Sequence, residues 1–240
     1  MPEPQSRNHD LMIESPETVL RAVLTIPENA RSIILFAHGA GSSRYNPRNQ
    51  YIAQKLHDAG FATLLMDLLT EDEDRIDAYT ARLRFDIPLL AGRLESVTGW
   101  VLAQEQMKDF DIGYFGADTG AAATLVAAIQ RPEVIRAIVC RGGRPDFAFT
   151  VLPEVKPPVL LIVGAKDQIV LEINKEAAKR LTTEHNLVIV PDASHLFEEP
   201  GKLDMVARRA QRWFTRYMKI SGDHSEATDK QAQIESYSFG

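Results

Sequence analysis

The chain has 240 residues, of which 45% are hydrophobic and 25% are charged, so it can bury one substantial core. Its formal net charge of -6 provides no basic field that would gather nucleic acid or an acidic membrane surface, and we expect neither as a partner. The single cysteine, Cys140, excludes an internal disulfide and a cysteine-based zinc site.

The two ends of the chain differ in character from the middle. The opening residues, MPEPQSRNHD, lack the order of a signal peptide, and no apolar run approaches the roughly 18 residues that would span a bilayer. We therefore expect a cytoplasmic protein. We expect a flexible N-terminus at residues 1–10, one folded domain at residues 11–220 and a flexible polar tail at residues 221–240.

Within the folded domain, short apolar runs alternate with helical patterns. Two strands, at residues 11–14 and 18–25, flank a turn and predict an antiparallel start. Further strands are expected at residues 32–37, 62–66, 112–115, 134–140, 159–163 and 187–190. Helices are expected at residues 47–59, 78–104, 120–129, 171–181 and 201–218, and the acidic run 71–74 is expected to be a solvated loop. The pattern predicts an α/β protein with helices on both faces of a mostly parallel sheet.

The stretch GADTG, residues 116–120, follows one predicted strand and opens a predicted helix. This is the context of a nucleophile elbow, a turn so tight that glycines flank the central residue. The central residue is Asp118, and aspartate tolerates a strained backbone better than most residues. A turn of small residues can also simply join a strand to a helix, so this motif alone does not establish a site.

Two more polar residues follow later strands in a telling order. Asp167 ends the stretch GAKD that follows the strand at residues 159–163, and His195 lies in the loop after the last strand. The order of elbow residue, acid and histidine is the one found in α/β-hydrolase enzymes. Because ligands of such sheets collect at the carboxyl ends of the strands, we expect Asp118, Asp167 and His195 to meet there as a catalytic triad.

The glycine-rich stretch HGAGSS, residues 38–43, follows the strand at residues 32–37. Backbone amides in such a loop can stabilise a developing oxyanion, and the second donor is the amide that follows the elbow residue. We assign this oxyanion-hole role to Ala40 and Thr119. His38 is expected to steady the loop through a hydrogen bond.

Taken together, these motifs make the chain similar to α/β-hydrolases of the dienelactone hydrolase-like group. The resemblance covers roughly residues 33–214 and includes FAHGAGSSR, LRFDIPLLAGRL, CRGGRPD, LLIVGAKD and SHLFEEPG. It implies a three-layer α/β-hydrolase fold, and the short connection at residues 141–158 leaves no room for a cap domain. It also implies that Asp167 is the triad acid and His195 the base. The nucleophile position falls on Asp118, where the group has serine or cysteine.

An aspartate at this position changes the expected chemistry. A carboxylate that attacks an ester carbonyl forms an anhydride and must expel a poor leaving group, whereas attack on an alkyl halide or epoxide gives a stable ester that water can open. Three hypotheses follow for a hydrolase-like cleft. Asp118 is a nucleophile for a small ester-like, lactone-like, alkyl-halide or epoxide substrate; the protein is a pseudo-enzyme or small-molecule-binding module; or the chain is a nucleophile variant of a serine esterase.

Other residues near the predicted strand ends are candidates to bind a substrate. Arg44 and Arg141 are candidates to bind an anionic small molecule, against the alternative that they are ordinary surface arginines. Cys140 is read as a buried apolar residue, and Asp86 as a helix cap or structural contact. No ligand cluster or dinucleotide motif accompanies the site, so we expect no metal and no cofactor. Whether the chain forms a homodimer is left open.

Overall fold

The computed structural model describes residues 8–39 and 42–220. Its centre is an eight-stranded sheet in the order β1-β2-β4-β3-β5-β6-β7-β8. The strands are β1 Asn8–Ser15, β2 Thr18–Thr25, β3 Ser32–Ala37, β4 Ala62–Met66, β5 Asp111–Ala117, β6 Ile135–Arg141, β7 Val159–Gly164 and β8 His185–Val190. Strands β3 to β8 pair in parallel, and β2 runs antiparallel to both of its neighbours, which confirms the predicted mixed sheet.

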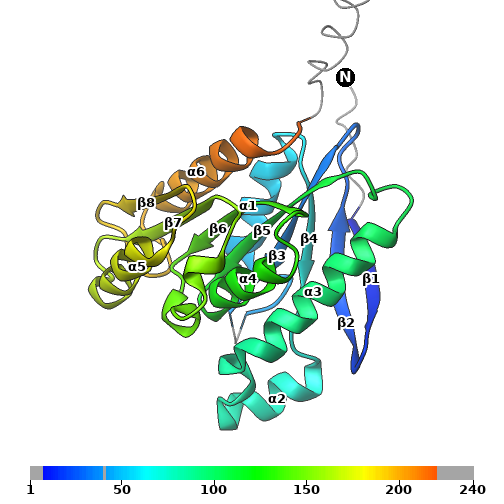
Figure 1. Cartoon of the computed structure of the whole chain (residues 1–240), viewed down its shortest axis with the longest axis horizontal. Coiled ribbons are helices and arrows are strands. Elements are labelled where there is room, and N and C mark those ends of the chain that lie inside the picture. Colours follow the sequence, from blue (N-terminus) through cyan, green and yellow to red (C-terminus); the bar gives the residue numbers. More distant parts are fainter. Residues whose placement is uncertain (1–7, 40–41, 221–240) are drawn as a thin grey trace, which may run out of the picture.

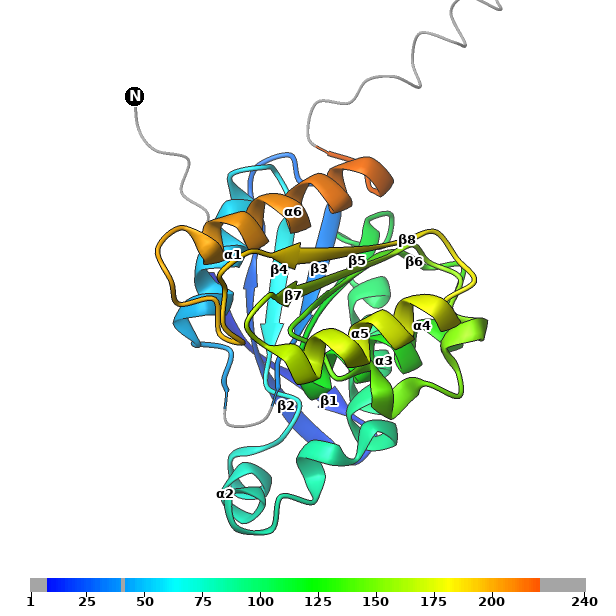
Figure 2. The same ribbon diagram turned by 90° about the vertical axis from the view of Figure 1, so that its left-hand side faces the viewer.

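Helices cover both faces of this sheet and make three layers (Figures 1 and 2). Helices α1 Pro47–His57 and α6 Lys202–Tyr217 pack together on one face, and α3 Ile87–Ala103, α4 Thr119–Gln130 and α5 Gln168–Arg180 lie on the other. The inner strands are buried on both sides: every residue of β3, β4, β5 and β7 is buried. This explains why they are continuously apolar rather than alternating.

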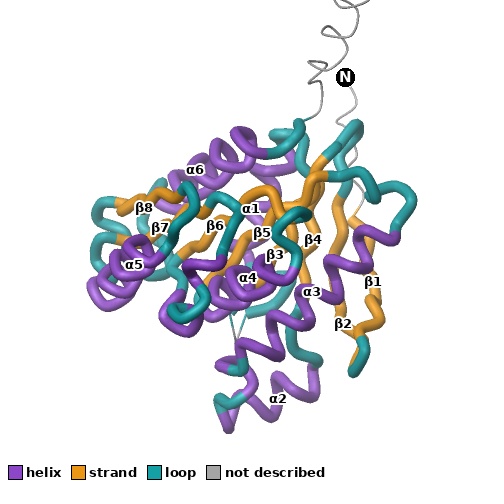
Figure 3. Tube along the Cα trace, in the orientation of Figure 1, coloured by secondary structure: helices purple, strands orange, loops and turns teal. Residues whose placement is uncertain are grey.

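The chain between β4 and α3 differs from the prediction. We expected one helix at residues 78–104 and a loop at residues 71–74; instead α2 Glu71–Thr80 and the short 3-10 helix η1 Leu83–Phe85 precede α3. The acidic run forms the first turn of α2, where Thr70 and Glu73 make a reciprocal capping box and carboxylates favour the helix N-terminus. Helix α2 ends at Ala81, whose φ of 51° is left-handed, and it projects away from the rest of the molecule (Figures 1 and 3).

Several element ends also differ from the prediction by a few residues. Strand β1 begins at Asn8, inside the segment expected to be flexible, because its main chain pairs with β2 as far as Thr25. Strand β5 extends to Ala117 and β6 to Arg141, directly beside the elbow. Two further 3-10 helices, η2 Pro145–Ala148 and η3 Leu152–Glu154, fill the connection from β6 to β7. Residues 1–7 of the predicted N-terminal segment 1–10, and the predicted tail 221–240, lie outside the described residues.

Candidate active site

The turn between β5 and α4 has the geometry of a nucleophile elbow. Asp118 adopts φ 52° and ψ -126°, a strained conformation for a residue with a side chain. A Cβ on Gly120 would collide with the main chain at Ala37, and a Cβ on Gly39 would lie 2.6 Å from the Asp118 Cβ and 2.7 Å from its Oδ2. Neither Gly39, in the loop after β3, nor Gly120, in α4, has room for a side chain, because β3, the elbow and α4 approach one another closely.

His195 and Asp167 form the expected pair. The His195 Nδ1 lies 2.7 Å from the Asp167 Oδ2. This contact orients the imidazole and does not engage its other nitrogen, Nε2. The Asp167 side chain is only 15% exposed, whereas that of His195 is 42% exposed. Asp167 is held from its other oxygen as well, since Oδ1 accepts a hydrogen bond of 3.4 Å from the Val170 amide at the start of α5.

The elbow and the His195 loop meet at a glycine turn after β6. A Cβ on Gly142 would lie 3.3 Å from the His195 Cε1, and the next residues are tied to the elbow because the Arg144 amide donates to the Asp118 carbonyl over 3.0 Å. Among the hydrogen bonds of the described residues, none joins the Asp118 carboxylate to His195. The structure thus brings Asp167 and His195 into direct contact, with Asp118 at the other side of a two-glycine turn.

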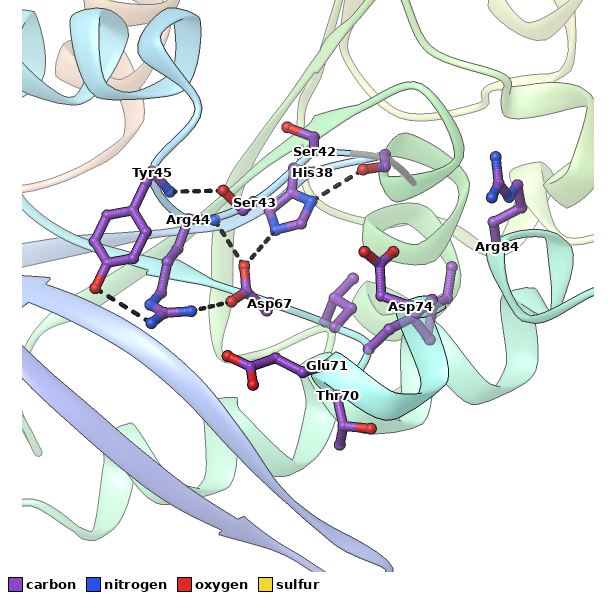
Figure 4. A pocket seen from close by; sticks show the side chains of 14 residues that line it. His38, Ser42, Ser43, Arg44, Tyr45, Asp67, Thr70, Glu71, Asp74 and Arg84 are labelled. Atoms are coloured by element: carbon purple, nitrogen blue, oxygen red, sulfur yellow. Dashed lines mark hydrogen bonds and ion pairs between the residues drawn. The ribbon is translucent and has the colours of Figure 1, made fainter. Parts of the chain in front are cut away.

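A second ionic cluster lies at the ends of β3 and β4 (Figure 4). The Asp67 carboxylate accepts from the His38 Nε2 at 3.1 Å and from the Arg44 amide at 2.7 Å, and it forms an ion pair with the Arg44 guanidinium. Burial opposes ionisation of Asp67, but the hydrogen bonds from His38 and Arg44 prevail and lower its pKa. This confirms the structural role predicted for His38, whose Nδ1 also lies 3.0 Å from the Gly39 carbonyl oxygen.

A pocket of about 250 Å³ opens beside this cluster. Its wall runs from the loop after β3 to α2 and η1 and combines apolar side chains with charged ones (Figure 4). Residues that line it include His38, Gly39, Arg44, Asp67, Asp74 and Arg84. It reaches the loop against which Asp118 packs, but Asp118, Asp167 and His195 do not line it. The pocket is therefore next to the elbow rather than centred on it.

The two candidate arginines have different surroundings. Arg44 is engaged by Asp67 and its guanidinium also stacks on the Tyr45 ring at 4.3 Å. Arg141 ends β6, and its Nη1 is buried without a hydrogen-bond partner among the described residues. The pKa of Arg141 is lowered to about 10: burial is the largest cause, the charge of Arg48 acts in the same direction, and Asp118 acts in the opposite direction.

The remaining predicted positions are the two oxyanion-hole residues, Cys140 and Asp86. Thr119 begins α4, so its amide lies at the positive end of that helix; Ala40 falls outside the described residues. Cys140 is completely buried, and burial raises the pKa of its thiol to about 12, which agrees with its prediction as an unreactive apolar residue. Asp86 caps α3 through the Leu89 amide, as predicted.

Within residues 8–39 and 42–220, no group of three or more histidine, cysteine, aspartate or glutamate side chains is arranged to hold a metal ion. In the same part of the chain, no helix is long and apolar enough to cross a bilayer.

The model of the dienelactone hydrolase family matches residues 20–225. The chain belongs to this family. A crystal structure of dienelactone hydrolase from Anabaena variabilis is 51% identical in sequence and covers 90% of this chain and 100% of its own, with a TM-score of 0.87. The eight-stranded sheet with its helical layers is accordingly the α/β-hydrolase fold.

More distant and longer proteins complete this comparison. Est1E from Butyrivibrio proteoclasticus is 15% identical and covers 86% of this chain and 98% of its own, with a TM-score of 0.73, which is a likeness of fold. Proteins from two Mycobacterium tuberculosis strains, each named "Putative phosphoribosyl transferase", are 48% identical over 216 residues. That match covers 90% of this chain but 48% of theirs, so this dienelactone hydrolase family chain spans about half their length.

Sequence reasoning missed two residues that shape the site. Asp67 pairs with His38 and Arg44, and its position directly after the predicted strand 62–66 was the available signal. Arg48 acts electrostatically on Arg141, and its Nε is buried without a hydrogen-bond partner among the described residues. The sequence alone does not reveal that the start of α1, which carries Arg48, lies near the end of β6.

Proposed function

We propose that the chain is a hydrolase in which Asp118 is the nucleophile and His195, oriented by Asp167, is the base. The carrying observation is that the carboxylate of residue 118 stands at a strained elbow while the 2.7 Å pair between His195 and Asp167 is complete. Membership of the dienelactone hydrolase family supports hydrolysis in general. Because the nucleophile is a carboxylate, we propose that the bond it breaks joins a saturated carbon to a leaving group.

The preferred substrate is a small molecule with a saturated carbon that carries a leaving group, such as an alkyl halide or an epoxide. One Asp118 oxygen forms a bond to that carbon, and the electron pair of the broken carbon–halogen bond leaves with the halide. In an epoxide the pair stays on the ring oxygen, which takes a proton. The product of this step is an alkyl ester of Asp118, in which the carboxylate charge has been lost.

Hydrolysis of that ester restores the enzyme. The His195 Nε2 takes a proton from water, and the hydroxide adds to the Asp118 carbonyl carbon. The Thr119 amide, at the N-terminus of α4, would stabilise the resulting oxyanion. Collapse releases the alkoxide, which takes the proton back from His195, and the Asp118 carboxyl group loses its own proton to solvent. The new carboxylate oxygen comes from water.

This proposal is tested by the mass of the intact protein. Incubating His195→Ala with bromoacetate or styrene oxide should trap an alkyl group on Asp118, because the base that opens the ester is missing, whereas p-nitrophenyl acetate would transfer an acetyl group and form an anhydride. Asp118→Asn is the matched control and should carry no adduct. Turnover of the unsubstituted chain in ¹⁸O-labelled water should place ¹⁸O in the Asp118 carboxylate. Absence of both adduct and turnover with all three reagents would reject the nucleophile role.

The second candidate is a binding module that holds a small molecule in the same cleft without chemistry. Two observations favour it: the Asp118 carboxylate has no hydrogen bond to His195 among the described residues, and the M. tuberculosis relatives have about twice the matched length. On this hypothesis the chain would act with a further domain, and the phosphoribosyl compounds in the relatives' name would be candidate ligands. Asp118→Ser separates the candidates further. A gain of esterase activity would indicate that the His195–Asp167 pair and the oxyanion hole are competent.

A further inference from the structure

The carboxyl-terminal edge of β6 carries a cationic group for which the described chain provides no complete set of partners. Arg141 is the last residue of β6, and its register pairs it with Ala117 of β5 and with Ile162 of β7. It therefore stands one residue from the elbow and between the strands that lead to Asp118 and Asp167.

The guanidinium of Arg141 is unusually placed for a charged side chain. Its Nη1 is buried and makes no hydrogen bond within the described chain, and no ion pair of the described residues includes it. Other arginines of the same region are satisfied: Arg144 donates through Nε and Nη2 to both oxygens of Asp146, at 2.9 and 2.7 Å. A buried donor without an acceptor costs free energy, so proteins seldom retain one without a use.

Two further donors without partners accompany Arg141. Arg48, on the first turn of α1, acts on Arg141 as a like charge, and its Nε is buried and unpartnered in the described part of the chain. Its Nη1 reaches Glu198 only at 3.3 Å. The hydroxyl of Thr119, directly after the elbow, is also buried without a hydrogen-bond partner. The positive charge of Arg48 thus disfavours the charged form of Arg141, and the Asp118 carboxylate favours it.

From this arrangement we infer that Arg141, assisted by Arg48, binds an anionic oxygen group of the ligand, a carboxylate or a phosphate monoester, beside Asp118. The planar fork of a guanidinium matches the paired oxygens of either group. This inference deepens the proposed function, on which it rests for the ligand's position: when Asp118 becomes a neutral ester, Arg141 loses the charge of that carboxylate, and a ligand anion replaces it. Arg44 is not assigned this role, because its guanidinium is held in an ion pair by Asp67, although its Nε is also buried without a hydrogen-bond partner among the described residues.

Direct binding tests the inference without requiring turnover. Titration calorimetry with acetate and with inorganic phosphate, against neutral acetamide, should show binding of at least one anion and none of the amide. Arg141→Gln should weaken that binding by about tenfold or more, which is the usual effect of losing a charged hydrogen bond. Arg136→Gln is the matched control: Arg136 is also on β6, but its side chain is 53% exposed and pairs with Asp111 at 3.2 Å at the opposite end of the strand.

Each outcome has a defined meaning. The anion affinity of Arg141→Lys should fall between those of the unsubstituted chain and Arg141→Gln. This order would support recognition by the fork of the guanidinium. Equal affinity for acetate, phosphate and acetamide, or unchanged anion affinity in Arg141→Gln with the thermal midpoint preserved, would overturn the inference. Anion binding that depends on Arg141, in a protein that never forms an adduct on Asp118, would uphold it while rejecting the nucleophile role. Acetate binding without phosphate binding would identify the anion as a carboxylate, and the reverse would identify a phosphate.

Discussion

Two charged clusters lie at the same edge of the sheet, and they differ in how completely the chain satisfies them. In the cluster at the ends of β3 and β4, Asp67 accepts from both His38 and Arg44, so each charge has a counterpart within the protein. In the cluster at the ends of β5 and β6, Asp118 and Arg141 make no side-chain hydrogen bond to each other, and the Arg141 Nη1 is left bare in the described chain. Charges that are paired internally stabilise the fold, whereas charges left open are available to a ligand.

The largest effect is expected from Asp167→Asn. If the proposed reaction uses His195 as base, loss of the carboxylate at its Nδ1 should favour the wrong tautomer and reduce kcat by about 10⁴-fold, as in other triads. The effect is measured as turnover of the best halide or epoxide substrate. Asp192→Asn, an exposed position in the same loop as His195, is the control and should have no effect. A decrease of less than about tenfold would show that the imidazole does not depend on Asp167.

His57 should be a main cause of the loss of folding stability in mild acid, although it does not belong to the candidate site. It lies on α1 with its Nε2 at 2.7 Å from the Thr63 Oγ1, and burial lowers its pKa from 6.5 to about 4. The unfolded chain therefore binds the extra proton first, so stability is complete above pH 6.5 and declines as pH falls towards 4. The whole shift corresponds to about 3 kcal/mol at most.

Urea unfolding at several pH values checks this assignment. His57→Gln should flatten the dependence of unfolding free energy on pH between 6.5 and 4, whereas the same change at the exposed His185 should not. An unchanged slope in His57→Gln would mean that another group titrates in this window. With that slope assigned, any pH dependence of ligand binding can be attributed to the site.

Asp67→Asn should destabilise the paired cluster. It removes the acceptor for Arg44 and His38, and we expect a loss of about 1–3 kcal/mol in unfolding free energy at neutral pH. Because the pKa of Asp67 is lowered in the folded state, its contribution is present above the unfolded value near 3.8 and is lost as pH falls through the folded value. The difference between the two proteins should therefore shrink in acid; a constant difference would point to packing instead of charge.

Arg141→Met should have the smallest effect and the opposite sign. An apolar side chain of similar length removes the cost of the buried, unpartnered Nη1, and we expect a gain of about 1 kcal/mol in unfolding free energy. Arg44→Met is the matched comparison and should lose stability, since Asp67 would be left without its ion pair. Loss of stability in both variants would remove the distinction between the two clusters.

Much of the sheet was predictable because burial on both faces leaves a strong signal. The strands at residues 18–25, 32–37 and 62–66 have the predicted bounds, and in the last two a largely apolar, fully buried run ends where the chain leaves the core. The break between α2 and α3 was not predictable in the same way. It depends on the left-handed Ala81 and on Asp77, a fully buried carboxylate that pairs with the Arg84 Nε at 2.6 Å.

The candidate site shows the same division. Asp118, Asp167 and His195 were predicted from their positions after strands, and the structure joins the last two in a hydrogen bond. Whether an arginine is satisfied cannot be read from local sequence, because its partner comes from another strand. Arg44 and Arg141 looked equivalent as candidates, and only the three-dimensional positions of Asp67 and Arg48 distinguish them.

The carboxylate of Asp167 performs two tasks with its two oxygens: Oδ2 holds the imidazole and Oδ1 caps the helix that follows. Fraying of that first turn would release one oxygen, let the side chain rotate, and turn the ring at position 195 away from its working direction. Helix initiation and imidazole alignment are therefore a single local equilibrium. Substitutions at residues 168–170 can therefore change the orientation of the His195 ring without contacting it, and amide exchange at Val170 would report how often the first turn of α5 opens.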